Sequence, residues 1–363
     1  MNRRLFLQMG LGCVLGQRIV GATEMPNFDT AASILAEAVR SRQIAAAVLH
    51  VARRDFRQSA AFGPGVVADS MFLLGSISKP VAVAALMTLS DRGEFSLDDR
   101  LQKFLPGFSG TGREQVTIRH LLRHVSGLPD QLPNNAALRS SHAPLSAFVE
   151  QAMATALQFE PASRYQYSSM GILLAAHVAE RIAGVDILTL IEQTVFKRLE
   201  MRRSAQGLGR FRLEDFVPVQ TERAAPESGG GDPASRDWDW NSAYWRRLGA
   251  PWGGTHASAG DIAVFLREFL EGQGRLVKPE TARAMIANQN PAGMTPRGLG
   301  FAVGPNAGSV GCSDRVFGHT GSTGTICWAD PADESICVVL TSLPATAANP
   351  HPRDQAANQI AKS

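Results

Sequence analysis

Segments that favour β-strands lie at the two ends of this chain, and the long stretch between them favours helices. Residues 44–52 and 57–63 have the composition of two short strands, and four more strand-like segments lie within residues 299–342. Strands so far apart in sequence most simply pair in one antiparallel sheet, with the helical middle inserted beside it. The order predicts an α/β protein of the α+β type, in which helices flank an antiparallel sheet and an all-helical domain is inserted.

This layout also predicts the domain boundaries. The sheet domain is expected to combine residues 26–75 and 290–363, and the helical domain to span residues 76–289. Apolar residues recur at helical spacing through the middle of the chain, and a closing helix is expected at residues 352–361. Residues 204–250 are rich in Gly, Pro and charge, which predicts long loops there.

The first 22 residues have the features of an export signal. Arg3 and Arg4 precede a short apolar stretch, and small residues lead up to Ala22. This pattern resembles a twin-arginine leader and predicts a periplasmic or extracellular protein, with a short amphipathic helix as the alternative.

Composition narrows the classes of partner. Hydrophobic residues make up 44% of the 363 residues and charged residues 19%, as in a soluble protein with a sizeable core. Removing residues 1–22 takes three arginines and no acid, so basic and acidic residues become equal in number. With no basic stripe, neither nucleic acid nor stable membrane insertion is expected after leader removal. A small-molecule or peptide substrate is expected, and the oligomeric state stays open.

Three cysteines follow the leader. Cys312, Cys327 and Cys337 match no zinc-binding spacing. Cys327 and Cys337 flank an expected hairpin turn, so one cross-strand disulfide is conceivable in an oxidising compartment. Three small buried apolar residues are the alternative, which we favour slightly.

Ser76 and Lys79 stand three residues apart where an apolar run meets an expected helix. Residues i and i+3 share a helix face, and the positive end of a helix lowers the pKa of a nearby ammonium. Lysine can therefore serve as a base for the serine, which arginine cannot. The chain has 31 arginines and only 5 lysines, so a lysine at this spacing is informative. A helix cap and a solvated lysine are the ordinary alternatives.

Two further segments carry candidate functional groups. Tyr167 precedes Ser168 and Ser169 at an expected helix start, and a tyrosine beside an ammonium can titrate low enough to relay a proton. Residues 318–325 form a glycine-rich segment beside an expected strand, where backbone N–H groups can hold an oxyanion. His319 and Thr320 offer side chains there to a substrate carboxylate or carbonyl. A half-buried tyrosine and a glycine-rich bulge are the alternatives.

Together and in this order, the three segments resemble the motifs of the penicillin-recognising serine hydrolases. These include class C β-lactamases, DD-carboxypeptidases, D-stereospecific peptidases and related esterases. Their S-x-x-K, Y-x-N/S and K/H-T/x-G motifs correspond to Ser76–Lys79, Tyr167–Ser169 and His319–Gly321. Supporting similarity extends over residues 28–343. The resemblance implies the β-lactamase/transpeptidase-like fold, with the active site at the junction of the two domains.

The resemblance also implies the roles of individual residues. Ser76 would attack a carbonyl and become acylated, while Lys79 and Tyr167 move protons. The backbone N–H groups of Ser76 and Ser322 would form the oxyanion hole. No metal or cofactor is implied. Substrate contacts would come from four residues, Ser169, His319, Thr320 and Gly321.

Two departures bear on the substrate. Ser169 replaces the asparagine usual in β-lactamases, and His319 replaces their lysine, which lowers the expectation of efficient β-lactam hydrolysis. We therefore expect an exported serine hydrolase acting on esters, amides or peptides of D-amino acids. The alternatives are a weak class C-like β-lactamase and a penicillin-binding or sensing protein that is acylated without turnover.

Four of the five tryptophans fall within the loop-rich region or just after it. They form either a local core under the loops or an apolar wall of the substrate cleft. They are Trp238, Trp240, Trp245 and Trp252.

Overall fold

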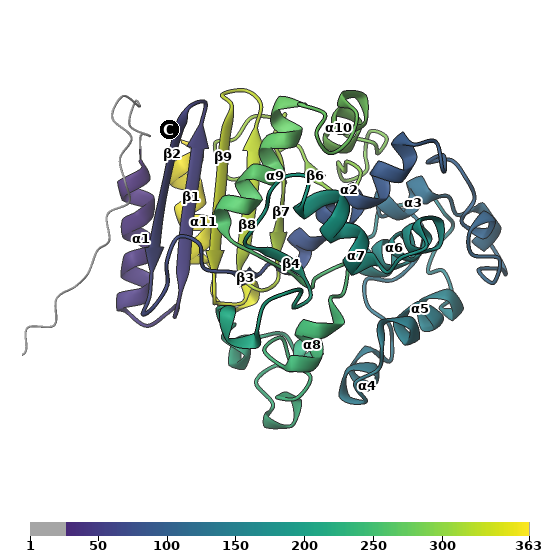
Figure 1. Cartoon of the computed structure of the whole chain (residues 1–363), viewed down its shortest axis with the longest axis horizontal. Helices are drawn as coiled ribbons and strands as arrows, with labels where there is room; N and C mark the ends of the chain where they lie inside the picture. The colour runs from purple at the N-terminus through teal and green to yellow at the C-terminus, as the bar shows by residue number, and fades with distance from the viewer. Residues whose placement is uncertain (1–26, 363) are drawn as a thin grey trace, which may run out of the picture.

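A six-stranded antiparallel sheet is the centre of the computed structural model, which describes residues 27–362 (Figure 1). The strand order is β2-β1-β9-β8-β7-β6. Strand β1 (Ala47–Arg53) lies between β2 (Phe56–Phe62) and β9 (Ser335–Thr341), so the two ends of the chain meet in one sheet. The predicted fold class is confirmed, while the predicted leader lies outside the described residues. The remaining strands are β8 (Thr325–Asp330), β7 (Phe317–Gly321) and β6 (Ala302–Val303).

Helices cover both faces of this sheet. The first and last helices, α1 (Phe28–Arg40) and α11 (Pro352–Ala361), pack together on one face. Helix α9 (Ala259–Glu271) packs on β1, β8 and β9 from the opposite face. Because α9 falls within residues 76–289, one helix of the range that we expected to be a helical domain covers the sheet instead.

Helix α2 (Ser78–Asp91) is the axis of the helical part. It is buried on every side from Ser78 to Leu89, as expected for a helix that is apolar all round. Helices α6 (Ser169–Ala183) and α7 (Ile187–Ile191) pack against it. The other helices are α3 (Ile118–Leu122), α4 (Asn135–Ser140), α5 (Leu145–Ala154), α8 (Ala243–Leu248) and α10 (Pro279–Ile286).

A small second sheet connects the helical part with the large sheet. Its strand order is β3-β5-β4, and it comprises β3 (Phe72–Leu73), β5 (Thr255–Ala257) and β4 (Ser204–Gln206). The loop prediction for residues 204–250 is confirmed, because only short helical turns, β4 and α8 interrupt the loops. Over the described residues, no helix is long and apolar enough to cross a membrane.

Helix α3 has only five residues. Thr117 caps its start by accepting a hydrogen bond from the backbone N–H of His120. The helix ends early because His124 adopts a left-handed backbone conformation, with φ of 59°. This turn places the His124 ring under Tyr167, with 4.7 Å between the ring centres.

The three cysteines within residues 27–362 are free thiols, and the conceivable disulfide between Cys327 and Cys337 is not formed. Strand pairing sets Cys327 opposite Val338 and Trp328 opposite Cys337. Because successive side chains of a strand point to opposite faces, the two thiols lie on opposite faces of the sheet. Each is buried in a different apolar cluster, so the alternative of small apolar core residues applies to both.

Gly321, at the end of β7, allows the large sheet to approach the segment that leads into α2. Thr325 donates a hydrogen bond from Oγ1 to the carbonyl oxygen of Leu74, 2.7 Å away. A Cβ atom on Gly321 would collide with both of these groups. The close approach aligns the end of β7 with Gly75 and Ser76.

We expect Gly321→Ala to lower the free energy of unfolding by about 1–3 kcal/mol, because the added methyl group overpacks this contact. Urea denaturation measures the change. Gly260→Ala in α9 is the control, since its Cβ would meet only Ser258 Oγ at 4.0 Å. It should be neutral or stabilising by about 0.5–1 kcal/mol. A Gly321→Ala protein as stable as the wild type would contradict this account.

Candidate active site

Ser76 and Lys79 meet at the start of α2. Ser76 lies in a short 3₁₀ turn, Gly75–Ile77, that runs directly into the helix. Lys79 Nζ is 3.0 Å from Ser76 Oγ and donates a second hydrogen bond to the carbonyl oxygen of Trp252, 2.9 Å away. Lys79 is fully buried, with 0% exposure, which excludes a solvated surface lysine.

Burial changes the acid–base behaviour of Lys79. It lowers the pKa of the Lys79 ammonium to about 7, with Asp130 opposing the shift and Arg297 adding to it. A substantial fraction of the amine is therefore neutral near neutral pH. A neutral amine at 3.0 Å is within reach of the Ser76 proton.

Tyr167 lies over this pair, just before α6. Ser168 caps the helix by accepting a hydrogen bond from Gly171 N, and the Tyr167 ring centre is 4.8 Å from Lys79 Nζ. The buried Tyr167 hydroxyl has no hydrogen bond of ordinary geometry to the described residues. Burial raises the pKa of Tyr167, although Arg297 and the Ser76 hydroxyl oppose the shift. The expectation of a low pKa is wrong, and this hydroxyl stays protonated.

His319 has a different environment from the one expected. It is buried on β7, where Nδ1 donates to the Thr320 carbonyl oxygen at 2.7 Å and Nε2 accepts from Arg297 at 2.6 Å. Burial first, and then Arg297 and Lys79, hold the pKa of His319 well below 6.5. His319 is therefore neutral, and the positive charge beside it belongs to Arg297.

The end of β7 lies against the turn that carries Ser76. Gly75 has φ of 57°, and a Cβ atom there would be 3.1 Å from the backbone nitrogen of Ser322. The backbone of Ser322 is thus next to the nucleophile turn, as an oxyanion hole built from Ser76 and Ser322 requires.

Two pockets meet at Ser76. Both are lined by Ser76, Tyr167 and Ser322, so a carbonyl at Ser76 would have space on either side of its reacting bond. The first pocket has a volume of about 340 Å³, and the second about 230 Å³. The first holds Arg297, His319, Thr320 and Gly321, and the second holds Asp130, Ser169 and three tryptophans.

Ser169 lies in the second pocket with its polar groups already bonded. Its backbone N–H and its hydroxyl both donate to Oδ1 of Asp130, at 2.9 and 2.6 Å. A substrate that accepts a hydrogen bond from the Ser169 hydroxyl would therefore compete with Asp130 for it.

Sequence reasoning missed Asp130 and Arg297. Neither residue type is rare in this chain, and each reaches the cleft only through the tertiary fold. Asp130 follows a turn after α3, and Arg297 precedes β6 in the connection from α10.

The tryptophans divide into two groups. Trp240, Trp245 and Trp252 line the second pocket and are also part of the large apolar core. Trp238 lines neither pocket at Ser76. Three of the four thus form an apolar wall of the cleft while packing under the loops, so the two alternatives both apply.

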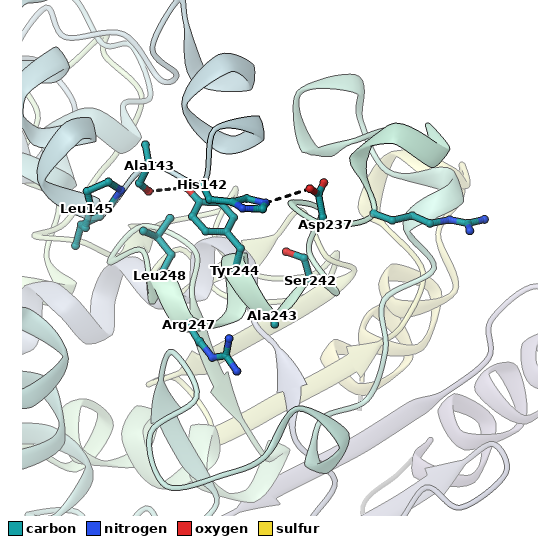
Figure 2. A pocket seen from close by; sticks show the side chains of 11 residues that line it. His142, Ala143, Leu145, Asp237, Ser242, Ala243, Tyr244, Arg247 and Leu248 are labelled. Atoms are coloured by element: carbon teal, nitrogen blue, oxygen red, sulfur yellow. Dashed lines mark hydrogen bonds and ion pairs between the residues drawn. The ribbon is translucent and has the colours of Figure 1, made fainter.

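Helix α8 separates this cleft from another pocket of about 700 Å³ (Figure 2). Tyr244 of α8 donates a hydrogen bond to the Ala143 carbonyl oxygen at 2.8 Å, and His142 Nε2 lies 3.3 Å from Asp237 Oδ2. These contacts join the loops that carry the tryptophans to the connection between α4 and α5. The lining of this pocket contains no serine–lysine pair.

Known proteins resemble this chain over nearly its whole length. A family model described as Beta-lactamase matches residues 31–362. A protein of Salmonella schwarzengrund (strain CVM19633), provisionally named a D-alanyl-D-alanine carboxypeptidase, is 28% identical over 316 residues, which cover 78% of this chain and 72% of that protein.

Solved structures share the fold. A penicillin-binding protein homologue from Caulobacter crescentus superposes with a TM-score of 0.75 at 20% identity, covering 94% of this chain and 98% of that one. A D-amino acid amidase from Ochrobactrum anthropi SV3, complexed with D-phenylalanine, gives 0.73 at 19% identity, covering 92% and 98%. With its β-lactamase/transpeptidase-like fold, this chain belongs to the β-lactamase family of serine hydrolases.

Proposed function

We propose that this enzyme forms an acyl-enzyme on Ser76 with esters, amides or short peptides of D-amino acids. The observation that carries the proposal is the 3.0 Å contact between Ser76 Oγ and a fully buried Lys79 whose pKa is lowered to about 7. The relative provisionally named a D-alanyl-D-alanine carboxypeptidase and the D-amino acid amidase support this substrate class.

The reaction follows from this geometry. Neutral Lys79 accepts the Ser76 proton as Oγ bonds to the substrate carbonyl carbon, and the backbone N–H groups of Ser76 and Ser322 hold the oxyanion. When the bond to the leaving group breaks, that group takes a proton from the Lys79 ammonium through the Tyr167 hydroxyl. Water then attacks the ester, and the Ser76 oxygen regains a proton as the acid departs.

The bond that breaks lies at Ser76, where the two pockets meet, so the leaving group and the acyl group occupy different pockets. The leaving group occupies the pocket with Arg297 and Thr320, where the guanidinium complements a carboxylate. The acyl group occupies the pocket with Asp130 and the tryptophans. Because Ser169 supplies a hydroxyl already bonded to Asp130, β-lactam hydrolysis ranks second.

The pH dependence tests the state of Lys79. A protonated amine cannot accept a proton, so kcat/KM for p-nitrophenyl butyrate should fall about tenfold per pH unit below about 7 and level off above it. His319 should add no inflection near 6.5, since its pKa lies well below that value. A flat profile across neutral pH would contradict the role of Lys79.

Lys79→Arg tests the base itself. Guanidinium stays protonated, so acylation should slow by about 10³-fold. Lys79→Met, which removes the base without a larger head group, should give a similar loss, and so should Ser76→Ala. Rates and intact-protein mass report acylation, while circular dichroism and melting temperature check the fold.

The double variant Ser76→Ala/Lys79→Met should be little worse than either single variant, because the two residues act as a unit. If both Lys79 variants fold and stay within tenfold of the wild type, the mechanism is wrong.

A further inference from the structure

Asp130 supplies a carboxylate to the acyl half of the cleft that the reaction described above does not use. It lines the second pocket together with Ser76, Tyr167 and Ser169. Its negative charge reaches the catalytic groups, since it raises the pKa of Lys79 against the effect of burial. The carboxylate therefore lies close enough to act on a substrate held at Ser76.

The hydrogen bonds of Asp130 orient it and leave one oxygen available. Both contacts from Ser169, through N and Oγ, go to Oδ1. Among the described residues, none donates a hydrogen bond to Oδ2 or forms an ion pair with Asp130 within 4.0 Å. Oδ2 is the acceptor of this carboxylate that a ligand can use.

An acceptor carboxylate discriminates between substrates by their hydrogen-bonding groups. An ammonium has three donors and a positive charge, so it forms a charge-assisted hydrogen bond with Oδ2. An N-acylated substrate keeps only one N–H donor, which is uncharged, and brings a carbonyl oxygen, a second acceptor, into the same pocket. The carboxylate therefore selects against the acylamino groups of penicillins and of blocked peptides.

The other groups of the pocket are compatible with such a ligand. Trp240, Trp245 and Trp252 offer apolar surface to the side chain of the acyl residue. Among the described residues that line this half, Arg139 is the other charged one, and its guanidinium carbon lies 3.7 Å from the Trp245 ring centre. On the far side of Ser76, Arg297 supplies positive charge. Besides Arg139, the cleft thus has a carboxylate on one side of the reacting bond and a guanidinium on the other, which complement the ammonium and the carboxylate of an unblocked peptide.

We propose that Asp130 binds the free α-ammonium of the acyl residue, so that the enzyme acts on unblocked amino-acid esters, amides and short peptides with an apolar first side chain. This rests on the proposed acyl-enzyme chemistry and specifies which end of the substrate enters the acyl pocket. Ser169 is a positioning residue for Asp130.

Matched methyl esters test the proposal in the full-length protein. D-phenylalanine methyl ester and its N-acetyl derivative differ only in the ammonium, and p-nitrophenyl butyrate reports on Ser76 with neither group. Near neutral pH, the wild type should use the unblocked ester at least about tenfold better than the acetylated one. Equal use, preference for the acetylated ester, or turnover of neither while the butyrate is cleaved would overturn the proposal.

Variants at Asp130 give a second readout. Asp130→Asn retains an acceptor for Ser169 but loses the charge, so kcat/KM for the unblocked ester should fall about 10- to 100-fold relative to the butyrate. Loss of the Asp130 charge also changes the pKa of Lys79. Dividing kcat/KM for the unblocked ester by kcat/KM for the butyrate cancels this effect, because both substrates need the same base. Asp130→Glu should restore part of the preference. Asp55→Asn, which removes an exposed carboxylate from the β1–β2 turn, should leave the ratio unchanged.

An unchanged ratio in Asp130→Asn would overturn the inference even if the wild type prefers unblocked esters. If Asp130→Asn does not fold, the wild-type comparison of the two methyl esters decides alone. If no substrate is cleaved in a Ser76-dependent way, the proposed function itself fails, and that result is distinct from a loss of selectivity.

Discussion

The active site depends on a lysine amine that the fold keeps out of water. Lys79 is held between Ser76, in the turn before α2, and the carbonyl oxygen of Trp252, in the loop before β5. A surface position would leave this ammonium protonated near neutral pH. Burying it requires apolar packing on every side of α2, and the helix has that packing from Ser78 to Leu89. The same packing that stabilises the protein thus lowers the pKa of Lys79, as the proposed role of a base requires.

Backbone contacts then set the geometry around this amine. Glycine at position 321 lets β7 lie against the Leu74 carbonyl, and glycine at 75 lets the nucleophile turn approach Ser322. Side chains at these positions would separate the sheet from α2. The large sheet and the helical part are therefore joined where the reaction requires the closest contact. Ser76 and Ser322, one from each part, can then act on the same carbonyl.

Local pattern was sufficient to predict part of this arrangement. The strands at both chain ends, the apolar helix after Ser76 and the three motifs all follow from neighbouring residues. The pKa of Tyr167 could not be predicted from neighbouring residues, because burial rather than the nearby ammonium dominates it. The protonation state of His319 could not be predicted either, because the pKa of His319 is lowered first by burial and then by Arg297 from a distant loop. Asp130 and Arg297 are ordinary residue types whose position in the cleft arises only from tertiary contacts.

The charges that escaped prediction also control the base. Burial lowers the pKa of Lys79 most, and on top of this Asp130 raises the pKa whereas Arg297 lowers it. A substrate ammonium bound at Asp130 adds positive charge beside Lys79 and offsets the field of the carboxylate. The pKa of Lys79 then falls further, so more of the amine is neutral when a substrate with a free ammonium is bound. If Asp130 binds the ammonium as proposed, selection of the substrate and activation of Ser76 are coupled through one carboxylate, because the proposed recognition group also opposes the deprotonation of Lys79.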